Sequence, residues 1–544
     1  MSESVTAGRG RDGGVLGPHF QATIPSVLQN LAETAPERTL VRTVAGESLT
    51  AVELWRRAQG LAGALAELGG RPGERVAVDL PNGLEMIEVF FGATLAGCVF
   101  VPLNTAWRRR SLARILADSE PAVLVGDASH LDELKDYARS RPQEAQVILV
   151  GPADTDADAI EYGSLGARSL PSPAVEVEAT SLGVLLYTSG TTGLSKGNML
   201  SHRASLWMAA TAAQTLDYSR GDIVHTCLPL FHANALQCGL LASMLGEAEF
   251  VIAPRFSASG FWDEVRDCGA THTALLGSMM PLLAARPPVE HDREHSVHTA
   301  YCAPLPENLE QFERRFGLKC ASTYGLTDAN ILTVRPADDS GVRSCGVASG
   351  DWELALVDGS DLPVGPGEVG ELVGRPRLPF IASSGYWRKP DATAELWRNL
   401  WCHSGDLLRQ DEQGRFHFID RKKDAIRKGG ENVSTFEVEE ALLTHPGIAE
   451  AAVIGVPSEL SEDDVMAFVV LAGSAEVAPR EILTLCAREL PFFAVPRYIE
   501  FTSELPRTEN HRVQKAALRE RGVSDRTWDA GPLNRRRVEE MAAE

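Results

Sequence analysis

No run of 18 apolar residues occurs in the 544-residue sequence, so no transmembrane helix is expected. The nine cysteines are scattered, without a CxxC pair or the spacing of metal ligands, which argues against a disulfide framework and a zinc site. A formal net charge of −22 argues against a nucleic-acid surface. Residues 1–17 lack an apolar segment, so residues 1–20 are predicted to be a disordered tail rather than a signal peptide. These absences favour a protein of the reducing cytoplasm.

The length exceeds that of one ordinary core, and 44% hydrophobic with 23% charged residues is typical of globular proteins, so more than one domain is expected. Residues 23–67 are predicted to form amphipathic helices, and 151–179 a loop. Between these segments, apolar strands alternate with a helical pattern. The predicted strands are 75–80, 98–103, 122–125 and 147–150, with a helix over 85–96. Such alternation predicts an α/β fold of parallel sheets covered by helices.

One stretch, residues 187–197, has the composition of a phosphate-binding loop. A buried strand over 183–187 runs into it, and a helix capped by Ser201 follows it. Glycines let backbone N–H groups turn inward, hydroxyls add donors and the lysine adds positive charge, which suits a polyphosphate. A P-loop is excluded, because Ser195 and Gly197 flank the lysine where that motif needs Gly and then Ser or Thr. The predicted phosphate ligands are Thr188, Ser189, Gly190, Thr191, Thr192, Gly193 and Lys196.

A second stretch, residues 322–328, has groups suited to a nucleoside and its phosphates. The ring of Tyr324 offers a flat face for adenine, and stacking of a base on an aromatic ring contributes about 1–3 kcal/mol. Thr327 supplies a hydroxyl for a phosphate. Asp406, which follows a glycine, is predicted to accept hydrogen bonds from ribose hydroxyls. The predicted nucleotide ligands in the second stretch are Ser322, Thr323, Tyr324 and Thr327.

With these motifs in this order, residues 25–520 resemble the adenylate-forming superfamily of acyl-CoA synthetases, luciferases and peptide-synthetase adenylation domains. Within it, the chain is most similar to the carnitine/crotonobetaine-CoA ligase-like branch. The resemblance implies an N-terminal ATP- and substrate-binding domain over 21–420, a hinge at 421–424 and a smaller mobile α/β lid domain over 425–544. Residues 367–372 and 385–387 match segments of a small β-rich subdomain. ATP and Mg²⁺ are the implied cofactors, with CoA as co-substrate.

The resemblance also assigns site residues. Asp328 takes the place of a glutamate that helps to hold Mg²⁺, and Arg421 is the expected partner of ribose or phosphate. The glycine turn Gly429, Gly430 and Glu431 is expected to line a thiol tunnel. The substrate pocket is expected to be lined by His232, Asn234, Gly277, Ser278, Tyr301, Cys302 and Ala303, with Tyr301 and Cys302 in place of the usual small residues.

The chain departs from the family most clearly near its end. His511 and Arg512 stand where the family has Gly and a catalytic Lys. Arg keeps the positive charge but is planar and bulkier, so the exchange is not conservative. Three alternatives remain open: Arg512 does the work of the lysine, Lys515 swings in, or the enzyme serves an unusual acceptor. We favour the first.

The implied activity is an ATP- and Mg²⁺-dependent ligase that activates a small carboxylic acid as acyl-AMP and transfers it to CoA. Its expected catalytic residues are Lys196, Thr327, Asp328 and Arg512. ATP-dependent diazotases, which activate nitrite for attack by an arylamine, share the same motifs and are the main alternative. A stand-alone domain that charges a carrier protein and a non-catalytic adenylate binder are further alternatives.

Overall fold

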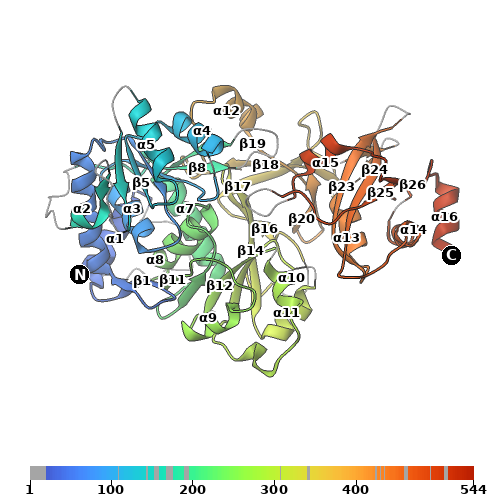
Figure 1. Ribbon diagram of the computed structural model, residues 1–544, viewed down its shortest axis with the longest axis horizontal. Coiled ribbons are helices and arrows are strands. Elements are labelled where there is room, and N and C mark those ends of the chain that lie inside the picture. Colours follow the sequence, from blue (N-terminus) through green and yellow to red (C-terminus); the bar gives the residue numbers. More distant parts are fainter. Residues whose placement is uncertain are drawn as a thin grey trace. The chain divides into compact units, whose positions relative to one another are not determined.

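The chain forms two compact units, labelled by element in Figure 1. Unit 1 comprises the described residues up to Leu354 together with Gly374–Cys402, and unit 2 comprises Ala355–Val373 and the described residues from His403 onward. The computed structural model describes residues 20–107, 109–141, 145–151, 159–166, 175–188, 195–277, 279–306, 308–339, 343–422, 426–428, 431–433, 435–458, 463–490, 492–507 and 513–543. The predicted tail, residues 1–20, therefore lies almost wholly outside them, and the predicted hinge at 421–424 stays a prediction.

The first sheet of unit 1 has seven strands in the order β7-β6-β5-β3-β4-β8-β9. Its strand pairs are parallel, except that β9 returns antiparallel to β8. The helices α4 (Arg109–Ser119) and α5 (Leu131–Ser140) pack on one face, to which alternate residues such as Val99 and Leu124 point. The strands are β3 (Arg75–Asp79), β4 (Val99–Pro102), β5 (Val123–Gly126), β6 (Gln146–Leu149), β7 (Ile160–Glu161), β8 (Leu182–Thr188) and β9 (Lys196–Ser201).

The second sheet of unit 1 has nine strands in the order β16-β15-β14-β13-β12-β10-β11-β1-β2. Its central strands are parallel, whereas β2, β15 and β16 run antiparallel to their neighbours. The strands are β1 (Thr39–Thr43), β2 (Ser48–Thr50), β10 (Ile223–Thr226), β11 (Glu249–Ile252), β12 (His272–Leu276), β13 (Thr299–Ala303), β14 (Lys319–Leu326), β15 (Asn330–Arg335) and β16 (Val347–Ala348). The helical segments that follow these strands are the π-helix η2 (Asn234–Leu241), α8 (Ala242–Leu245), α9 (Phe261–Asp267), α10 (Met279–Ala284), η3 (Glu290–Arg293) and α11 (Leu309–Phe316).

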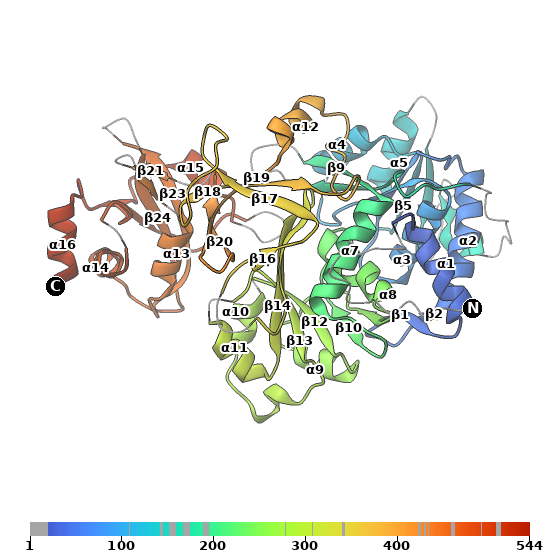
Figure 2. The same cartoon turned by 180° about the vertical axis from the view of Figure 1, so that it is seen from behind.

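Helix α7 (His202–Leu216) lies between the two sheets and contacts β8 and β9 of one and β14 and β15 of the other (Figure 2). All its residues except Gln214 are buried. The helix begins after Ser201, whose Oγ accepts a hydrogen bond of 3.0 Å from the backbone N–H of Ala204. The other helices of unit 1 are α1 (Ile24–Thr34), α2 (Ala51–Glu67), α3 (Leu84–Leu95), α6 (Tyr162–Gly166), α12 (Pro390–Leu396) and η4 (Arg398–Leu400).

Unit 2 holds most of a four-stranded sheet, β17-β18-β19-β20, and a second sheet in the order β23-β24-β25-β26. Alternate residues of the second sheet face opposite sides: Val453 and Val465 pack with α13 and α14, whereas Ile454 and Met466 pack with α15. The elements are β17 (Trp352–Val357), β18 (Val369–Pro376), β19 (Cys402–Gln410), β20 (Phe416–Arg421), β21 (Ile426–Lys428), β22 (Glu431–Val433), α13 (Thr435–Leu443), β23 (Ile448–Pro457), β24 (Asp463–Leu471), α14 (Pro479–Glu489), β25 (Tyr498–Phe501), α15 (Lys515–Arg521), β26 (Trp528–Asp529) and α16 (Arg535–Ala543).

The α/β class predicted from the sequence is confirmed, and its first four predicted strands correspond to β3, β4, β5 and β6. Three local predictions are wrong. Residues 23–67 are not helical throughout, because β1 and β2 separate α1 from α2, and the predicted loop 151–179 contains β7 and α6. Lys196 and Gly197 lie on β9 rather than in a loop, because their backbones pair with β8.

Two further features concern composition. Among the described residues, no helix is long and apolar enough to cross a membrane.

All nine cysteines are described, and all but Cys345 are buried. Burial raises the pKa of several of these thiols to about 12, among them Cys98, Cys227, Cys238 and Cys486.

The turn between β14 and β15 depends on a close approach of two backbones. A bulge lies between Tyr324 and Gly325, and a Cβ on Gly325 would lie 2.2 Å from the carbonyl oxygen of Asn330. Asn330 has a φ of 84°, and its Nδ2 donates to the carbonyls of Ala204 at 2.9 Å and Ile381 at 2.7 Å. The turn is thereby tied to α7, and no side chain fits at Gly325.

We expect Gly325→Ala to lower the stability of unit 1 by about 1–3 kcal/mol, because the new methyl group forces the backbones apart. Thermal unfolding followed by circular dichroism measures this. Gly350→Ala is the matched control, since a Cβ there meets no atom within 4 Å. Equal loss in the two variants would contradict the interpretation.

Candidate active site

Strands β8 and β9 hold the two ends of the predicted phosphate loop. Thr188 at the end of β8 pairs with Lys196 at the start of β9. On the other side of β9, segment 383–387 adds backbone hydrogen bonds, from Met199 N–H to Gly385 O at 2.9 Å and from Trp387 N–H to Gly197 O at 2.7 Å. The predicted ligands Ser189, Gly190, Thr191, Thr192 and Gly193 lie outside the described residues. Strand β9 is therefore held between β8 and segment 383–387, with Thr188 and Lys196 at the two ends of the predicted loop.

Lys196 and Asp328 come together around the ring of Tyr386. The Nζ of Lys196 lies 4.7 Å from the centroid of that ring. The Tyr386 hydroxyl donates a hydrogen bond to the Asp328 carboxylate, whose Oδ1 also accepts from Asn198 Nδ2 at 2.8 Å. Ser383 Oγ bonds to Asn198 Oδ1 and so fixes the orientation of the amide. An ammonium and a carboxylate are thus positioned by neutral donors beside the loop.

The electrostatics of this cluster suit a cation beside a phosphate. Burial raises the pKa of Asp328, although the hydrogen bond from Tyr386 and the charge of Lys196 oppose the rise. Burial and the negative charge of Asp328 raise the pKa of Tyr386, which keeps its hydroxyl protonated as a donor. The carboxylate charge is thus only partly compensated, and a carboxylate oxygen is the ligand that Mg²⁺ prefers.

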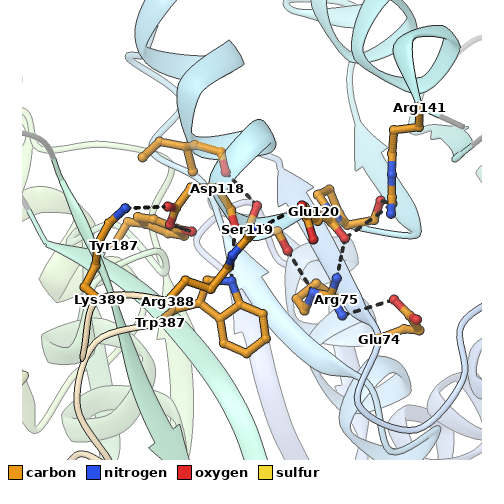
Figure 3. A network of polar contacts seen from close by, with 12 residues as sticks. Glu74, Arg75, Asp118, Ser119, Glu120, Arg141, Tyr187, Trp387, Arg388 and Lys389 are labelled. Atoms are coloured by element: carbon orange, nitrogen blue, oxygen red, sulfur yellow. Dashed lines mark hydrogen bonds and ion pairs between the residues drawn. The ribbon is translucent and has the colours of Figure 1, made fainter. Parts of the chain in front are cut away.

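A polar network anchors helix α4 to β8 and to the segment that follows Tyr386 (Figure 3). The Tyr187 hydroxyl donates to Asp118 Oδ2 at 2.8 Å, and Lys389 Nζ lies 3.1 Å from Asp118 Oδ1. Trp387 Nε1 donates to the Asp118 carbonyl at 3.0 Å. Residues before the loop and residues after Tyr386 are therefore fixed to the same helix end.

Strand β14 carries the second predicted motif. Ser322 and Thr323 are buried, and their hydroxyls bond to β13: Ser322 Oγ donates to Cys302 O at 2.7 Å, and Thr323 Oγ1 lies 2.8 Å from Tyr301 Oη. These two side chains hold the strand in place. Tyr324 and Thr327 are partly exposed, as contact with a nucleotide requires.

The predicted pocket residues cluster where β12, β13 and η2 meet, but they do not share one face. Tyr301 is buried beside Cys238 of η2, whereas Cys302 lies beside Cys320 on the opposite side of the sheet. A Cβ on Gly277 would lie 2.8 Å from Pro304 Cδ, so only glycine fits beside Ala303, whose peptide bond to Pro304 is cis.

At the other wall of the predicted pocket, the His232 ring packs edge-on against Phe231. Asn234 begins the π-helix η2, a rare element that often occurs at functional sites. Ser278 lies outside the described residues.

Unit 2 carries the predicted ribose ligand. Asp406 on β19 is opposite Arg421 on β20, with Arg421 Nε 3.6 Å from Asp406 Oδ1. The neighbouring Gly405, with a φ of 70°, donates its N–H to Glu371 Oε1 at 3.1 Å. Glu371 is buried and also bonds to Lys422 Nζ at 2.6 Å and His403 Nδ1 at 3.2 Å. Glu371 thereby fixes the turn that presents Asp406.

Lys515 is held inside unit 2. Its Nζ lies 2.8 Å from Glu439 Oε1 and donates to Thr435 Oγ1 at 2.5 Å, and Thr435 in turn donates to Asp420. The Lys515 ammonium therefore has two partners within unit 2. Of the other predicted residues in this part of the chain, Glu431 lies on β22. The residues outside the described ranges are Lys423, Asp424, Gly429, Gly430, His511 and Arg512.

Three residues that hold predicted ligands in place are absent from the predicted set: Asn198 and Tyr386 in unit 1, and Glu371 in unit 2. Tyr386 and Glu371 fall in the segments 385–387 and 367–372 that resemble the family, which is the only indication the sequence contains. The sequence contains no indication of the role of Asn198, because this role arises only when β9 pairs with segment 383–387.

Known proteins show the same organisation. The family model "AMP-binding enzyme" matches residues 28–387, and "AMP-binding enzyme C-terminal domain" matches 437–512. The chain is 34% identical over 496 residues to feruloyl-CoA synthase of an Amycolatopsis species, covering 90% of this chain and 97% of that protein. It is 30% identical over 467 residues to crotonobetaine/carnitine–CoA ligase of Salmonella typhi, covering 83% and 89%. ATP-bound MatB from Rhodopseudomonas palustris has a similar structure, with a TM-score of 0.82, 27% identity and coverage of 91% and 98%.

The Glu371 cluster predicts an acid-dependent stability. Burial alone would raise the pKa of Glu371, but hydrogen bonds from Lys422 and His403 outweigh it and lower the pKa below 4.5. Its contribution to stability is therefore complete above pH 4.5 and is lost as the pH falls through the lowered pKa. Thermal unfolding of unit 2 across the acidic range should show a steeper loss in the parent than in Glu371→Gln. The exposed Glu412→Gln is the control and should follow the parent; a Glu371→Gln curve as steep as the parent's would contradict the prediction.

Proposed function

This chain belongs to the family of AMP-binding enzymes, and we propose that it activates a small carboxylic acid as an acyl-adenylate and transfers the acyl group to CoA. Membership makes it an AMP-forming ligase of the acyl-CoA synthetase type that binds ATP. The observation that carries the proposal is the placement of Lys196, at the start of β9, and of Asp328 against the same Tyr386 side chain. The names of the feruloyl-CoA and crotonobetaine/carnitine–CoA relatives support a carboxylic acid as substrate and CoA as acceptor.

In the proposed adenylation, the substrate carboxylate attacks the α-phosphorus of ATP and pyrophosphate leaves. Both reactants are anions, so the chief task of the protein is to offset their repulsion. Lys196 and the hydroxyls from Thr188 to Thr192 would bind the β- and γ-phosphates, with Thr327 beside them. Tyr324 would stack on adenine, while Asp406 and Arg421 would hold the ribose.

Mg²⁺ fits the residues present. Mg²⁺ is bound through one or two carboxylates together with phosphate oxygens and waters, and Asp328 offers one half-buried carboxylate for this purpose. Bound there, the ion would neutralise charge on the phosphates. The hydrogen bond from Asn198 Nδ2 to Asp328 Oδ1 fixes the orientation of the carboxylate.

The second half-reaction would follow a rotation of the 425–544 lid domain about the 421–424 hinge. Arg512 would act in adenylation and then withdraw, and Gly429, Gly430 and Glu431 would line the path of the incoming thiol. The acid would occupy the space lined by residues around η2, β12 and β13, with His232, Asn234 and Tyr301 as walls.

The proposed activity is tested by acid-dependent exchange of pyrophosphate into ATP and by the mass of the product formed with CoA. A panel of aliphatic, aryl and cinnamic-type acids should include one that supports both exchange and an acyl-CoA product. Exchange without acyl-CoA, together with a diazo product from nitrite and an arylamine, would assign the diazotase activity instead. Pyrophosphate exchange with acyl transfer only to a carrier protein would identify a carrier protein as the acceptor. The absence of any exchange would indicate a protein that binds adenylates without catalysis.

Arg512 is the sharpest mutational test of the first half-reaction. We expect Arg512→Ala to slow adenylation by about 100-fold or more, because a charge at the transition state is lost. Thioester formation from preformed acyl-adenylate should be nearly unchanged. Arg512→Lys should be partly active, with fuller recovery when it is combined with His511→Gly. The rates are measured by pyrophosphate exchange and by single-turnover transfer to CoA.

Lys515→Met is the matched control for this series. It should lower the unfolding temperature, because Glu439 is left without its cation, while adenylation in the folded protein stays near the parent rate. If Lys515→Met abolishes adenylation and Arg512→Ala does not, the role belongs to Lys515.

A further inference from the structure

Three polar side chains meet at the amino-terminal ends of three neighbouring strands of the nine-stranded sheet. Asp222 precedes β10, His272 begins β12 and His298 precedes β13, and β12 pairs with both other strands (Figure 2). Their ligand atoms all lie within 4.8 Å of one another. The predicted pocket residues Gly277 and Ala303 are at the opposite, carboxyl ends of β12 and β13. This cluster is therefore separate from the candidate active site.

Each ring turns one nitrogen toward the carboxylate. His272 Nε2 donates to the carbonyl of Leu216 at 3.1 Å, so its Nδ1, 3.7 Å from Asp222 Oδ1, carries no proton in the neutral ring. His298 Nδ1 lies 3.1 Å from Thr299 Oγ1, and its Nε2 is 3.7 Å from the same Asp222 Oδ1. Metal-ligating histidines commonly bind a carbonyl or hydroxyl through the second ring nitrogen in this way.

The carboxylate is fixed in place as well. Asp222 Oδ2 accepts hydrogen bonds from the backbone N–H and Oγ of Ser219, at 2.9 and 2.8 Å. This leaves Oδ1 directed at the two imidazoles. The Thr271 hydroxyl lies 3.0 Å from Asp222 Oδ1 and 2.9 Å from His272 Nδ1, but its single proton can be donated to only one of them. Asp222 Oδ1 and the unprotonated His272 Nδ1 are therefore two acceptors that share one donor proton from Thr271.

The two histidines differ in exposure. The His272 side chain is only 2% exposed. His298, by contrast, is 60% exposed, so an ion can enter from solvent and its remaining positions can be filled by water.

We propose that Asp222, His272 and His298 form a site for one Zn²⁺ ion at the amino-terminal edge of this sheet. Two imidazoles and one carboxylate with open positions suit Zn²⁺ and its first-row neighbours, whereas Mg²⁺ and Ca²⁺ need oxygen ligands. Zn²⁺ about 2.1 Å from each ligand holds the ligand atoms about 3.4 Å apart, whereas both imidazole nitrogens lie 3.7 Å from Asp222 Oδ1 and all three atoms lie within 4.8 Å of one another. Binding therefore draws the three ligands closer together, with the exposed His298 side chain as the one that moves. The expectation of no zinc site came from the spacing of the cysteines alone. This site has no cysteine ligand, so that expectation does not apply to it.

The bound ion would link the starts of β10, β12 and β13 and stabilise the folded sheet without touching the reacting groups. The proposal does not depend on the proposed function, because all its readouts are made without substrate.

The test uses the full chain without a histidine tag, stripped of metal and free of nucleotide. Calorimetry with ZnCl₂ should show one ion per chain and a raised unfolding temperature, and MgCl₂ should show neither. His298→Ala, a change at an exposed side chain, should weaken Zn²⁺ binding about 10-fold or more, and Asp222→Asn should do the same. His291→Ala is the matched control, since His291 is an exposed histidine 2.6 Å from Glu294, and it should bind as the parent does.

Cobalt spectroscopy identifies the ligands. Co²⁺ bound to the parent should show ligand-field bands without a thiolate-to-cobalt charge-transfer band, and His298→Cys should introduce that band. A thiolate band in the parent would place the ion at a cysteine and overturn the proposal. So would unchanged Zn²⁺ affinity in His298→Ala, or no Zn²⁺ binding by the parent.

Discussion

The burial of α7 between two sheets is the constraint on which unit 1 depends. A helix covered on all sides has no solvent for its polar groups, so most of them bond within the protein, with Ser205 Oγ as an exception. Ser201 caps its start, Trp207 Nε1 donates to Asp351 at 2.9 Å and Thr215 returns its hydroxyl to the Thr211 carbonyl at 2.7 Å. His202 meets the same demand by staying neutral, since burial lowers its pKa to about 4. The strands around this helix are those that carry the candidate site.

The candidate site follows from that arrangement. Strands β9 and β14 both contact α7, and Asn198 on β9 is bonded to Asp328 in the turn that follows β14. A displacement of α7 would therefore move Lys196 and Asp328 together, because both are attached to elements packed on the same helix. Both residues are thus positioned by the core of unit 1.

The sequence predicts well what local composition decides. Buried strands such as β3 and β4 are continuous apolar runs, which local composition indicates without tertiary context. Strand β9 was missed because its sequence, with Lys196, Gly197 and Asn198, has little strand propensity and becomes a strand only by pairing. Tyr386 and Asn198 were missed for the same reason, since their meeting with Asp328 depends on long-range contacts.

Buried thiols give this protein a chemical property that matters for an enzyme making activated acyl groups. An acyl-adenylate reacts with any accessible thiolate, and a protein thiol that ionised near the site would compete with the intended acceptor. Here desolvation holds the thiols of Cys227 and Cys238 in the protonated form, with a pKa of about 12. These two buried thiols are therefore poor nucleophiles toward an activated acyl group.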